Sequence, residues 1–311
     1  MVDLSSYFTF GISVGLLYPE AALSAERQLS AFTKTAQLPH YESLEAILSD
    51  EPSIRKAQIE IAKEEGKIIN YNFPPEFQVP GQFDPSSENP LYRKSALERA
   101  KTQVDYAYEA GSKVIGMTSG IDHGEENREQ SLIYFKEYMV ALADYAKQAG
   151  IVLTLEPVER GVFKNLLLGP TEEISAFVKM MNDEGHDNVA VLFDTAHMPL
   201  MKEDPITAVR IAHEVGIGHI HIGNAIVSNK NNPLYGHTHP PIGIMDGEYD
   251  FSDVALFFKE LVDLGYLSKE KTTRKKCLSL EMTGYPGVSP ELSAMVAYEK
   301  IASAWQMVLE S

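Results

Sequence analysis

Four side chains that can bind a divalent metal ion each stand at the end of a short apolar run. They are Glu156, Asp194, His221 and Glu281. Carboxylate oxygens together with one imidazole nitrogen suit a hard or borderline divalent ion. The carboxylates would repel one another in a pocket of low dielectric constant, and a bound dication relieves that repulsion. The pattern therefore predicts a site for one divalent ion, with Mn²⁺ as the first candidate and Mg²⁺, Co²⁺ or Zn²⁺ as alternatives.

Further histidines can take part in chemistry at the same place. His219 shares a strand face with His221 but lies deeper in the run, so we expect it to pack or to support the ligand. His123 follows another apolar run, and His239 lies in a long loop. Both are candidate general bases or substrate contacts, and a solvated loop histidine is the alternative for each. His237, in the same loop as His239, is a candidate substrate-binding residue.

Strands of one sheet must position these residues. Helical stretches along the chain end in glycine and are followed by short apolar runs, as at Gly111 and Gly150. Glycine in that place takes the left-handed conformation that closes a helix. The runs are typical of parallel strands buried on both faces. We expect them near residues 8–14, 42–47, 67–72, 113–118, 151–156, 189–194, 217–222 and 277–282. The run at 42–47 can also be interpreted as part of a helix.

Strands and helices that alternate in this way predict one α/β domain over residues 1–311, a closed (β/α)8 TIM barrel. In such a barrel the carboxyl ends of the strands and the loops after them form the active-site face. Two loops, 74–89 and 224–249, are long enough to serve as walls or lids. The predicted metal ligands should therefore meet on one rim.

Composition and charge exclude several classes of protein. The chain has 311 residues, of which 44% are hydrophobic and 23% charged, so a disulfide miniprotein and a disordered tail are excluded. The net charge of −17 opposes binding to nucleic acid or to an anionic membrane. Cys277 is the single cysteine, and the first residues lack the basic region of a signal peptide. We expect a cytoplasmic protein with a small-molecule partner, and neither nucleic acid nor a membrane.

Several fragments resemble those of the xylose-isomerase-like barrels, a superfamily that includes sugar isomerases and epimerases, inosose dehydratases and endonuclease IV. The fragments are Leu155-Glu156-Pro157, Phe193-Asp194-Thr195-Ala196-His197, Gly218-His219-Ile220-His221-Ile222-Gly223 and Leu280-Glu281. The resemblance to its ketose 3-epimerases implies one Mn²⁺ or Co²⁺ at the four positions named first. It implies that Glu156 and Glu281 also exchange protons with the substrate carbon. It further implies that His197 contacts a substrate oxygen, and Arg160 matches an arginine of the same loop.

Two departures from these relatives bear on the function. The epimerases carry an acid and then an arginine after the His-x-His segment, whereas this chain has Asn224-Ala225-Ile226-Val227. Endonuclease IV is similar at 237–243, a segment that supplies metal ligands there, with His237 in place of an aspartate. Its additional histidines after the third and fourth strands have no counterpart, so its three-zinc cluster cannot be completed, and the negative charge also opposes a nuclease.

The metal and the paired glutamates suit removal of a proton next to a carbonyl, which gives an enediolate. Returning the proton makes a sugar isomerase or epimerase. Losing a β-substituent makes a lyase, as in inosose dehydratases or in C-glycoside deglycosidases that act on 3-oxo-glucosides. A non-catalytic sugar-binding barrel is the third alternative. The partner is then a sugar or glycoside, and the chain forms homo-oligomers or, as the deglycosidases imply, hetero-oligomers with a small second subunit. The missing arginine predicts that a free ketose is a poor substrate.

Overall fold

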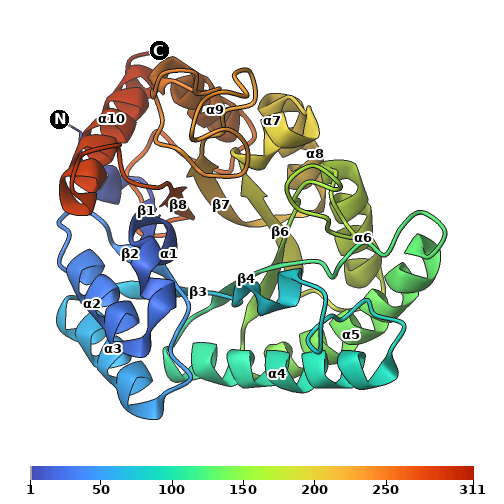
Figure 1. The fold of residues 1–311 in the computed structure, drawn as a ribbon. Helices are drawn as coiled ribbons and strands as arrows, with labels where there is room; N and C mark the ends of the chain where they lie inside the picture. Colours follow the sequence, from blue (N-terminus) through green and yellow to red (C-terminus); the bar gives the residue numbers. More distant parts are fainter. Residues whose placement is uncertain (1) are drawn as a thin grey trace. The chain divides into compact units, whose positions relative to one another are not determined.

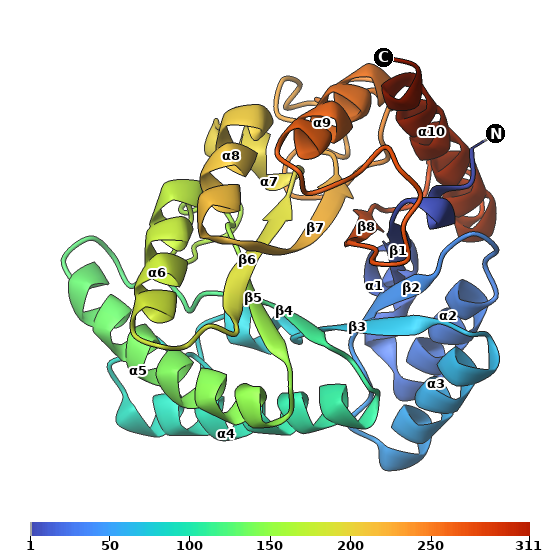
Figure 2. The same ribbon diagram turned by 180° about the vertical axis from the view of Figure 1, so that it is seen from behind.

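The computed structural model describes residues 2–311, whose strands form one closed parallel barrel in the order β1 to β8 (Figures 1 and 2). Every strand expected from the sequence is present to within one residue at each end, and the run near residue 44 is a strand, not a helix. The strands are β1 Thr9–Ser13, β2 Ser43–Ala46, β3 Ile68–Asn72, β4 Val114–Thr118, β5 Val152–Glu156, β6 Val189–Asp194, β7 Ile217–Gly223 and β8 Cys277–Glu281.

Helices follow the strands as the alternating pattern predicts. They are α1 Val14–Leu17, α2 Ala25–Ala36, α3 Pro52–Glu64, α4 Pro90–Glu109, α5 Arg128–Gln148, α6 Thr171–Asp183, α7 His197–Met201, α8 Pro205–Val215, α9 Phe251–Asp263 and α10 Pro290–Glu310. Gly111 and Gly150 lie just beyond α4 and α5 with φ of 73° and 67°, the left-handed conformation expected for a residue that closes a helix. Within residues 2–311, no helix is both long and apolar enough to cross a membrane.

The chain divides into two compact units. The first contains residues 2–69, 194–207 and 220–311. In it β1 pairs with both β2 and β8, and β7 pairs with β8. Helices α9 and α10 lie side by side (Figures 1 and 2). Trp305 of α10 packs edge-on against Phe8 and Phe258, with ring centroids 5.3 and 5.7 Å apart. These contacts anchor α10 to α9 and to the segment just before β1.

The second unit contains residues 70–193 and 208–219. Its central strands are β4 and β5, which pair in register from Val114–Val152 to Thr118–Glu156, and β5 pairs with β6. Helices α4 and α5 lie side by side (Figure 1). The helix α5 buries an apolar stripe, whose members are Phe135, Met139, Leu142 and Ala146. This packing holds β5, at whose end Glu156 stands.

Candidate metal and active site

Three of the four predicted metal ligands lie together in the first unit. His221 Nδ1 is 3.2 Å from Glu281 Oε1, and ligand atoms of Asp194, His221 and Glu281 lie within 4.8 Å of one another. Asp194 and His221 are 0% and 1% exposed, and the Glu281 side chain is 12% exposed. Two carboxylates this close and this buried repel each other. Together with the imidazole they form a donor set that fits a divalent ion.

The local backbone explains how Asp194 reaches this place. Asp194 ends β6, and its Oδ1 accepts a hydrogen bond of 2.8 Å from the backbone N–H of Ala196. Gly223 ends β7 in register with Glu281, and a Cβ on Gly223 would lie only 2.8 Å from Asp194 Oδ1. Thr195 Oγ1 donates to the carbonyl of Gly223 and accepts from its N–H. The absence of a side chain at Gly223 therefore leaves the space that the Asp194 carboxylate occupies.

Glu45, on β2, is a buried carboxylate of this site that the sequence analysis missed. It is 2% exposed, its Oε1 accepts a hydrogen bond of 2.6 Å from Ser279 Oγ, and its Oε2 is 3.7 Å from His221 Nε2. His221 therefore has a carboxylate at each ring nitrogen, Glu281 at Nδ1 and Glu45 at Nε2. The signal in the sequence was an acid inside the apolar run Leu44-Glu45-Ala46. Because that run also fits a helix, the sequence alone does not place Glu45 at the site.

Three histidines from separate segments join the same region of the first unit. The ring of His197 lies 4.8 Å from that of His237 and 5.3 Å from that of His239, centroid to centroid. His197 Nε2 is 3.4 Å from Asp194 Oδ2. His239 Nδ1 is 3.7 Å from Asp194 Oδ2 and 3.5 Å from Glu281 Oε2. The structure thus brings the three histidines that were chosen from the sequence together with Asp194 and Glu281.

Glu156 ends β5 in the second unit and is half-buried. Strand β5 pairs with β6 in parallel, and Leu155 stands opposite Val191. Glu156 therefore stands at the carboxyl end of the strand next to the one that Asp194 ends. The end of β5 at Glu156 agrees with the expected strand, and its role as a metal ligand stays a prediction.

His123 and Arg160 also lie in the second unit, where both have charged partners. His123 Nε2 is 2.7 Å from Oδ2 of the buried Asp84. Arg160 pairs with Glu173 and donates to the carbonyls of Leu166 and Leu167. These contacts hold the loop between β5 and α6. A catalytic role for His123 and substrate contact by Arg160 stay predictions.

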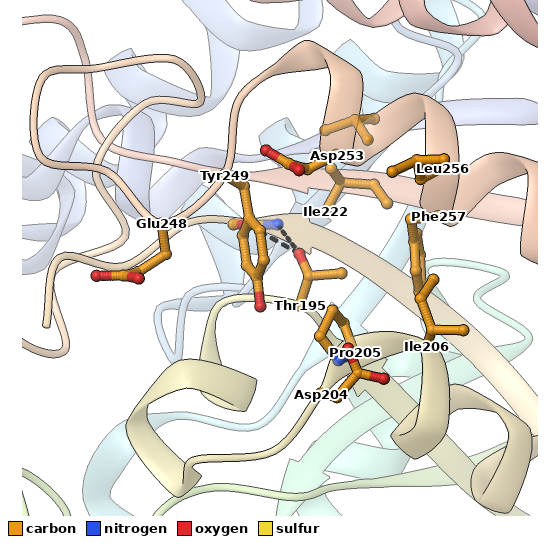
Figure 3. A pocket seen from close by; sticks show the side chains of 12 residues that line it. Thr195, Asp204, Pro205, Ile206, Ile222, Glu248, Tyr249, Asp253, Leu256 and Phe257 are labelled. Atoms are coloured by element: carbon orange, nitrogen blue, oxygen red, sulfur yellow. Dashed lines mark hydrogen bonds between the residues drawn. The ribbon is translucent and has the colours of Figure 1, made fainter.

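A pocket of about 240 Å³ opens beside Thr195 in the first unit (Figure 3). Its wall combines apolar side chains, among them Ile222 and Phe257, with the phenol of Tyr249. Burial, and next the negative charge of Asp194, raise the pKa of Tyr249, so its hydroxyl stays protonated at neutral pH. The pocket is lined by Thr195, the residue that follows Asp194 in the chain. No pattern in the sequence predicts the pocket, because its lining comes from four separate segments.

Comparison with known proteins identifies the family. Residues 37–298 match the model of the xylose isomerase-like TIM barrel, so the chain belongs to that family, as its motifs suggested. A crystal structure of a D-tagatose 3-epimerase-like protein superposes with a TM-score of 0.73 over 97% of this chain and 98% of that one, at 20% sequence identity. At that identity the match supports the fold alone.

Two curated relatives are similar in sequence over part of their length. The L-ribulose 3-epimerase of Mesorhizobium japonicum is 30% identical over 151 residues, 47% of this chain and 48% of the relative. The D-psicose 3-epimerase of Agrobacterium fabrum is 38% identical over 95 residues, 30% of each chain. The chain thus matches about half or less of the length of these relatives.

Proposed function

We propose that this protein is a divalent-metal-dependent sugar isomerase or epimerase. It removes the proton next to the carbonyl of a keto sugar and returns it through an enediolate. The observation that carries the proposal is the convergence of Asp194, His221 and Glu281 at the carboxyl ends of parallel strands. The names of the curated relatives, an L-ribulose and a D-psicose 3-epimerase, support the same reaction class.

The proposed ligands of the ion are Glu156, Asp194, His221 and Glu281, because carboxylates with one imidazole suit a divalent cation. Glu156 belongs to the set because its strand pairs with β6, which Asp194 ends. A Mn²⁺ ion bound there would act as a Lewis acid that polarises the substrate carbonyl. Mg²⁺, Co²⁺ and Zn²⁺ are the alternatives for the same donors.

The side chains around the ion transfer the proton and bind the substrate. Glu156 and Glu281 carry the proton from and to the substrate carbon, because each presents a carboxylate at the rim. His197 holds a substrate oxygen, and His239, 3.5 Å from Glu281, is placed to exchange a proton with it. His237, whose ring lies 4.8 Å from that of His197, is proposed to bind the substrate as well.

Two residues of the second unit complete the proposal. His123 is a further candidate base, because Asp84 Oδ2 lies 2.7 Å from its Nε2 and so orients the imidazole ring. Arg160 remains a proposed substrate contact. Its guanidinium also donates hydrogen bonds to Glu173 and to a carbonyl of its own loop. Both roles depend on the substrate reaching the loops after β4 and β5.

A lyase with the same first step is the second candidate, and Asn224 favours it. This residue stands where the resemblance places the substrate-binding segment of the epimerases. Its fully buried amide instead donates to the carbonyls of Pro241 and Tyr249 and accepts from the N–H of Tyr249. The long loop after β7 is thereby fixed, with His239 close to Glu281. A fixed imidazole at that place can protonate a leaving group.

The products of a substrate panel distinguish the two candidates. Purified enzyme with Mn²⁺ is incubated with ribulose, psicose and fructose, with 2-keto-inositol, and with 3-oxo-glucosides, and the products are analysed by NMR. An epimer at the carbon next to the carbonyl, in a ketose or in an oxidised sugar, establishes the epimerase. Release of water or of an aglycone establishes the lyase. A metal-loaded protein that converts none of these compounds would contradict both.

Removal of the metal should abolish turnover and lower the melting temperature. Native protein binds the ion and unfolded chain does not, so an excess of ion about 1,000-fold above Kd adds about 4 kcal/mol to the free energy of unfolding. We therefore expect a chelator to lower Tm by several degrees and Mn²⁺ to restore both Tm and activity. If elemental analysis found no metal and the chelator left the activity unchanged, the proposal would be contradicted.

Glu45→Gln should weaken metal binding without unfolding the protein. The carboxylate at His221 Nε2 orients the ring for the ion at its other nitrogen, and loss of such a partner typically costs about 10–100-fold in metal affinity. The glutamine keeps an acceptor for Ser279. Glu42→Gln, which removes a carboxylate bound to Lys275 just before β2, is the matched control and should leave metal Kd unchanged. An unaltered Kd in Glu45→Gln would show that Glu45 does not support His221.

A further inference from the structure

The pocket beside Thr195 lies on the outer side of strand β7, away from the candidate metal site. Ile222 of β7 lines the pocket, whereas the preceding residue of the strand, His221, faces Glu281. Successive side chains of a strand point to opposite faces of the sheet. The other wall of the pocket includes Phe257 of α9. A ligand in the pocket and a ligand at the ion would therefore lie on opposite sides of β7.

The inner wall of the pocket is apolar and buried. Ile222, Val254 and Phe257 line it and are 1%, 4% and 3% exposed. The rings of Tyr249 and Phe257 stand on opposite sides of the pocket (Figure 3). Its volume of about 240 Å³ exceeds the roughly 150 Å³ of a cavity that can hold benzene. One six-membered ring with a short substituent therefore fits between these walls.

The rim of the pocket is acidic. Asp204, Glu248 and Asp253 line it, and no lysine, arginine or histidine is among the described residues of the lining. Asp204 and Asp253 are exposed, and Glu248 is half-buried. The first turns of α8 and α9 also border the pocket. A helix N-terminus carries about half a positive charge, which the full negative charges of these carboxylates outweigh. The rim therefore attracts cations and repels anions.

The hydroxyl of Tyr249 adds a polar contact inside the pocket. It has no hydrogen-bond partner within residues 2–311, and it stays protonated because burial raises its pKa. Four carboxylates raise that pKa further, and they belong to Asp194, Glu248, Asp204 and Asp253. Negative potential thus converges on this hydroxyl from several segments. Its oxygen can accept a hydrogen bond from an ammonium group.

We propose that this pocket is a separate ligand site for a small organic cation that consists of one ring and an ammonium group. The ring would lie between Tyr249 and Phe257, and the ammonium group would reach the rim at Asp204 or Asp253. The aromatic faces also favour a cation near them. Carboxylic acids and phosphates would meet the rim carboxylates and be repelled. The site does not depend on which reaction the protein performs at the ion.

Three ring compounds that differ in charge test the pocket without an activity assay. Benzylamine, benzyl alcohol and benzoate are titrated into the protein, with Mg²⁺ and with a chelator, and binding is followed by ligand-observed NMR. We expect benzylamine to bind about 3–10-fold more tightly than benzyl alcohol at low salt, because each exposed charge pair contributes a small factor. High salt should reduce this advantage by screening. Benzoate should bind more weakly than either.

A replacement that fills the pocket locates the binding. Ile206 lines the pocket in the first turn of α8, and Ile206→Phe should reduce binding of benzylamine and benzyl alcohol below detection. Ile133→Phe is the matched control, since Ile133 is 47% exposed on α5 and lines no part of the pocket. It should leave both affinities unchanged. Benzylamine that binds Ile206→Phe as well as wild type, or only in the presence of chelator, would place it elsewhere and overturn the proposal.

Removal of the rim charges tests the class of ligand. The double variant Asp204→Asn, Asp253→Asn should still bind benzyl alcohol but lose the preference for benzylamine. Each asparagine can still accept the hydrogen bond that the aspartate accepts, from the N–H of Thr207 and of Asp250. Equal affinity for all three compounds in the wild type, or no binding of benzylamine, would overturn the proposal. If Ile206→Phe melts well below wild type, the double variant decides the result.

Discussion

Replacing Glu281 with glutamine should lower turnover by about 10²–10⁴-fold while most of the metal is retained. The amide keeps an oxygen that can bind the ion but cannot accept the substrate proton, and general acid–base catalysis typically contributes this factor. Glu281 Oε1 lies 3.2 Å from His221 Nδ1, and its Oε2 lies 3.5 Å from His239 Nδ1. Glutamine has the same size and keeps a polar group opposite both imidazoles. Turnover and metal content are measured on the same preparation.

Glu42→Gln serves as the control for the Glu281 variant. Its carboxylate binds Lys275 away from the site, so we expect turnover within about twofold of the wild type. The prediction is wrong if Glu281→Gln loses metal and excess Mn²⁺ restores full turnover. In that event Glu281 is only a ligand, and His239 or His123 becomes the candidate base.

Asp194→Asn should reduce metal affinity more than it reduces stability. We expect a loss larger than the roughly 10–100-fold that removal of an outer hydrogen-bond partner costs, because a direct carboxylate donor disappears. The fold should survive because an asparagine Oδ1 can still accept the hydrogen bond from Ala196. The neighbours Leu192 and Phe193, both buried, supply the packing of this strand. Calorimetric titration with Mn²⁺ measures the affinity.

Without metal, Asp194→Asn should melt at or above the temperature of metal-free wild type. The reason is that the variant removes one of several buried carboxylates that repel each other. Asp122→Asn is the matched control, since Asp122 is also buried but binds Arg128 through two hydrogen bonds. It should lower Tm and leave metal affinity unchanged. A metal-free Asp194→Asn that melts well below wild type would show that the carboxylate stabilises the fold directly.

The barrel could be predicted from the sequence because its strands are short apolar runs that follow helix-closing glycines. All of the strands appeared where expected, and even the ambiguous run at 42–47 proved to be a strand. Its sequence fits a helix as well as a strand in isolation. Pairing with β1, in which Gly11 stands opposite Ser43, makes it a strand. Tertiary pairing of that kind cannot be inferred from local propensity.

The site could be predicted where its residues end strands and not where they come from loops. Asp194, His221 and Glu281 end strands or stand near their ends, and the parallel arrangement gathers them. The approach of His239 to Glu281 depends on the path of a long loop, which hydrogen bonds of Asn224 and Thr283 determine. Those contacts leave no periodic pattern in the sequence. Glu45 could not be predicted as a site residue, because the run that contains it fits a helix as well as a strand.

Solvent deuterium exchange tests the proposed metal-assisted proton abstraction most directly. The enzyme is incubated in D₂O with a keto sugar from the panel, with Mn²⁺ or with a chelator, and the carbon next to the carbonyl is monitored by NMR. We predict that wild type with Mn²⁺ introduces deuterium at that carbon, and that chelator or Glu281→Gln abolishes the exchange. Epimerisation or elimination without deuterium uptake, or uptake that persists in the metal-free protein, would contradict the proposed function.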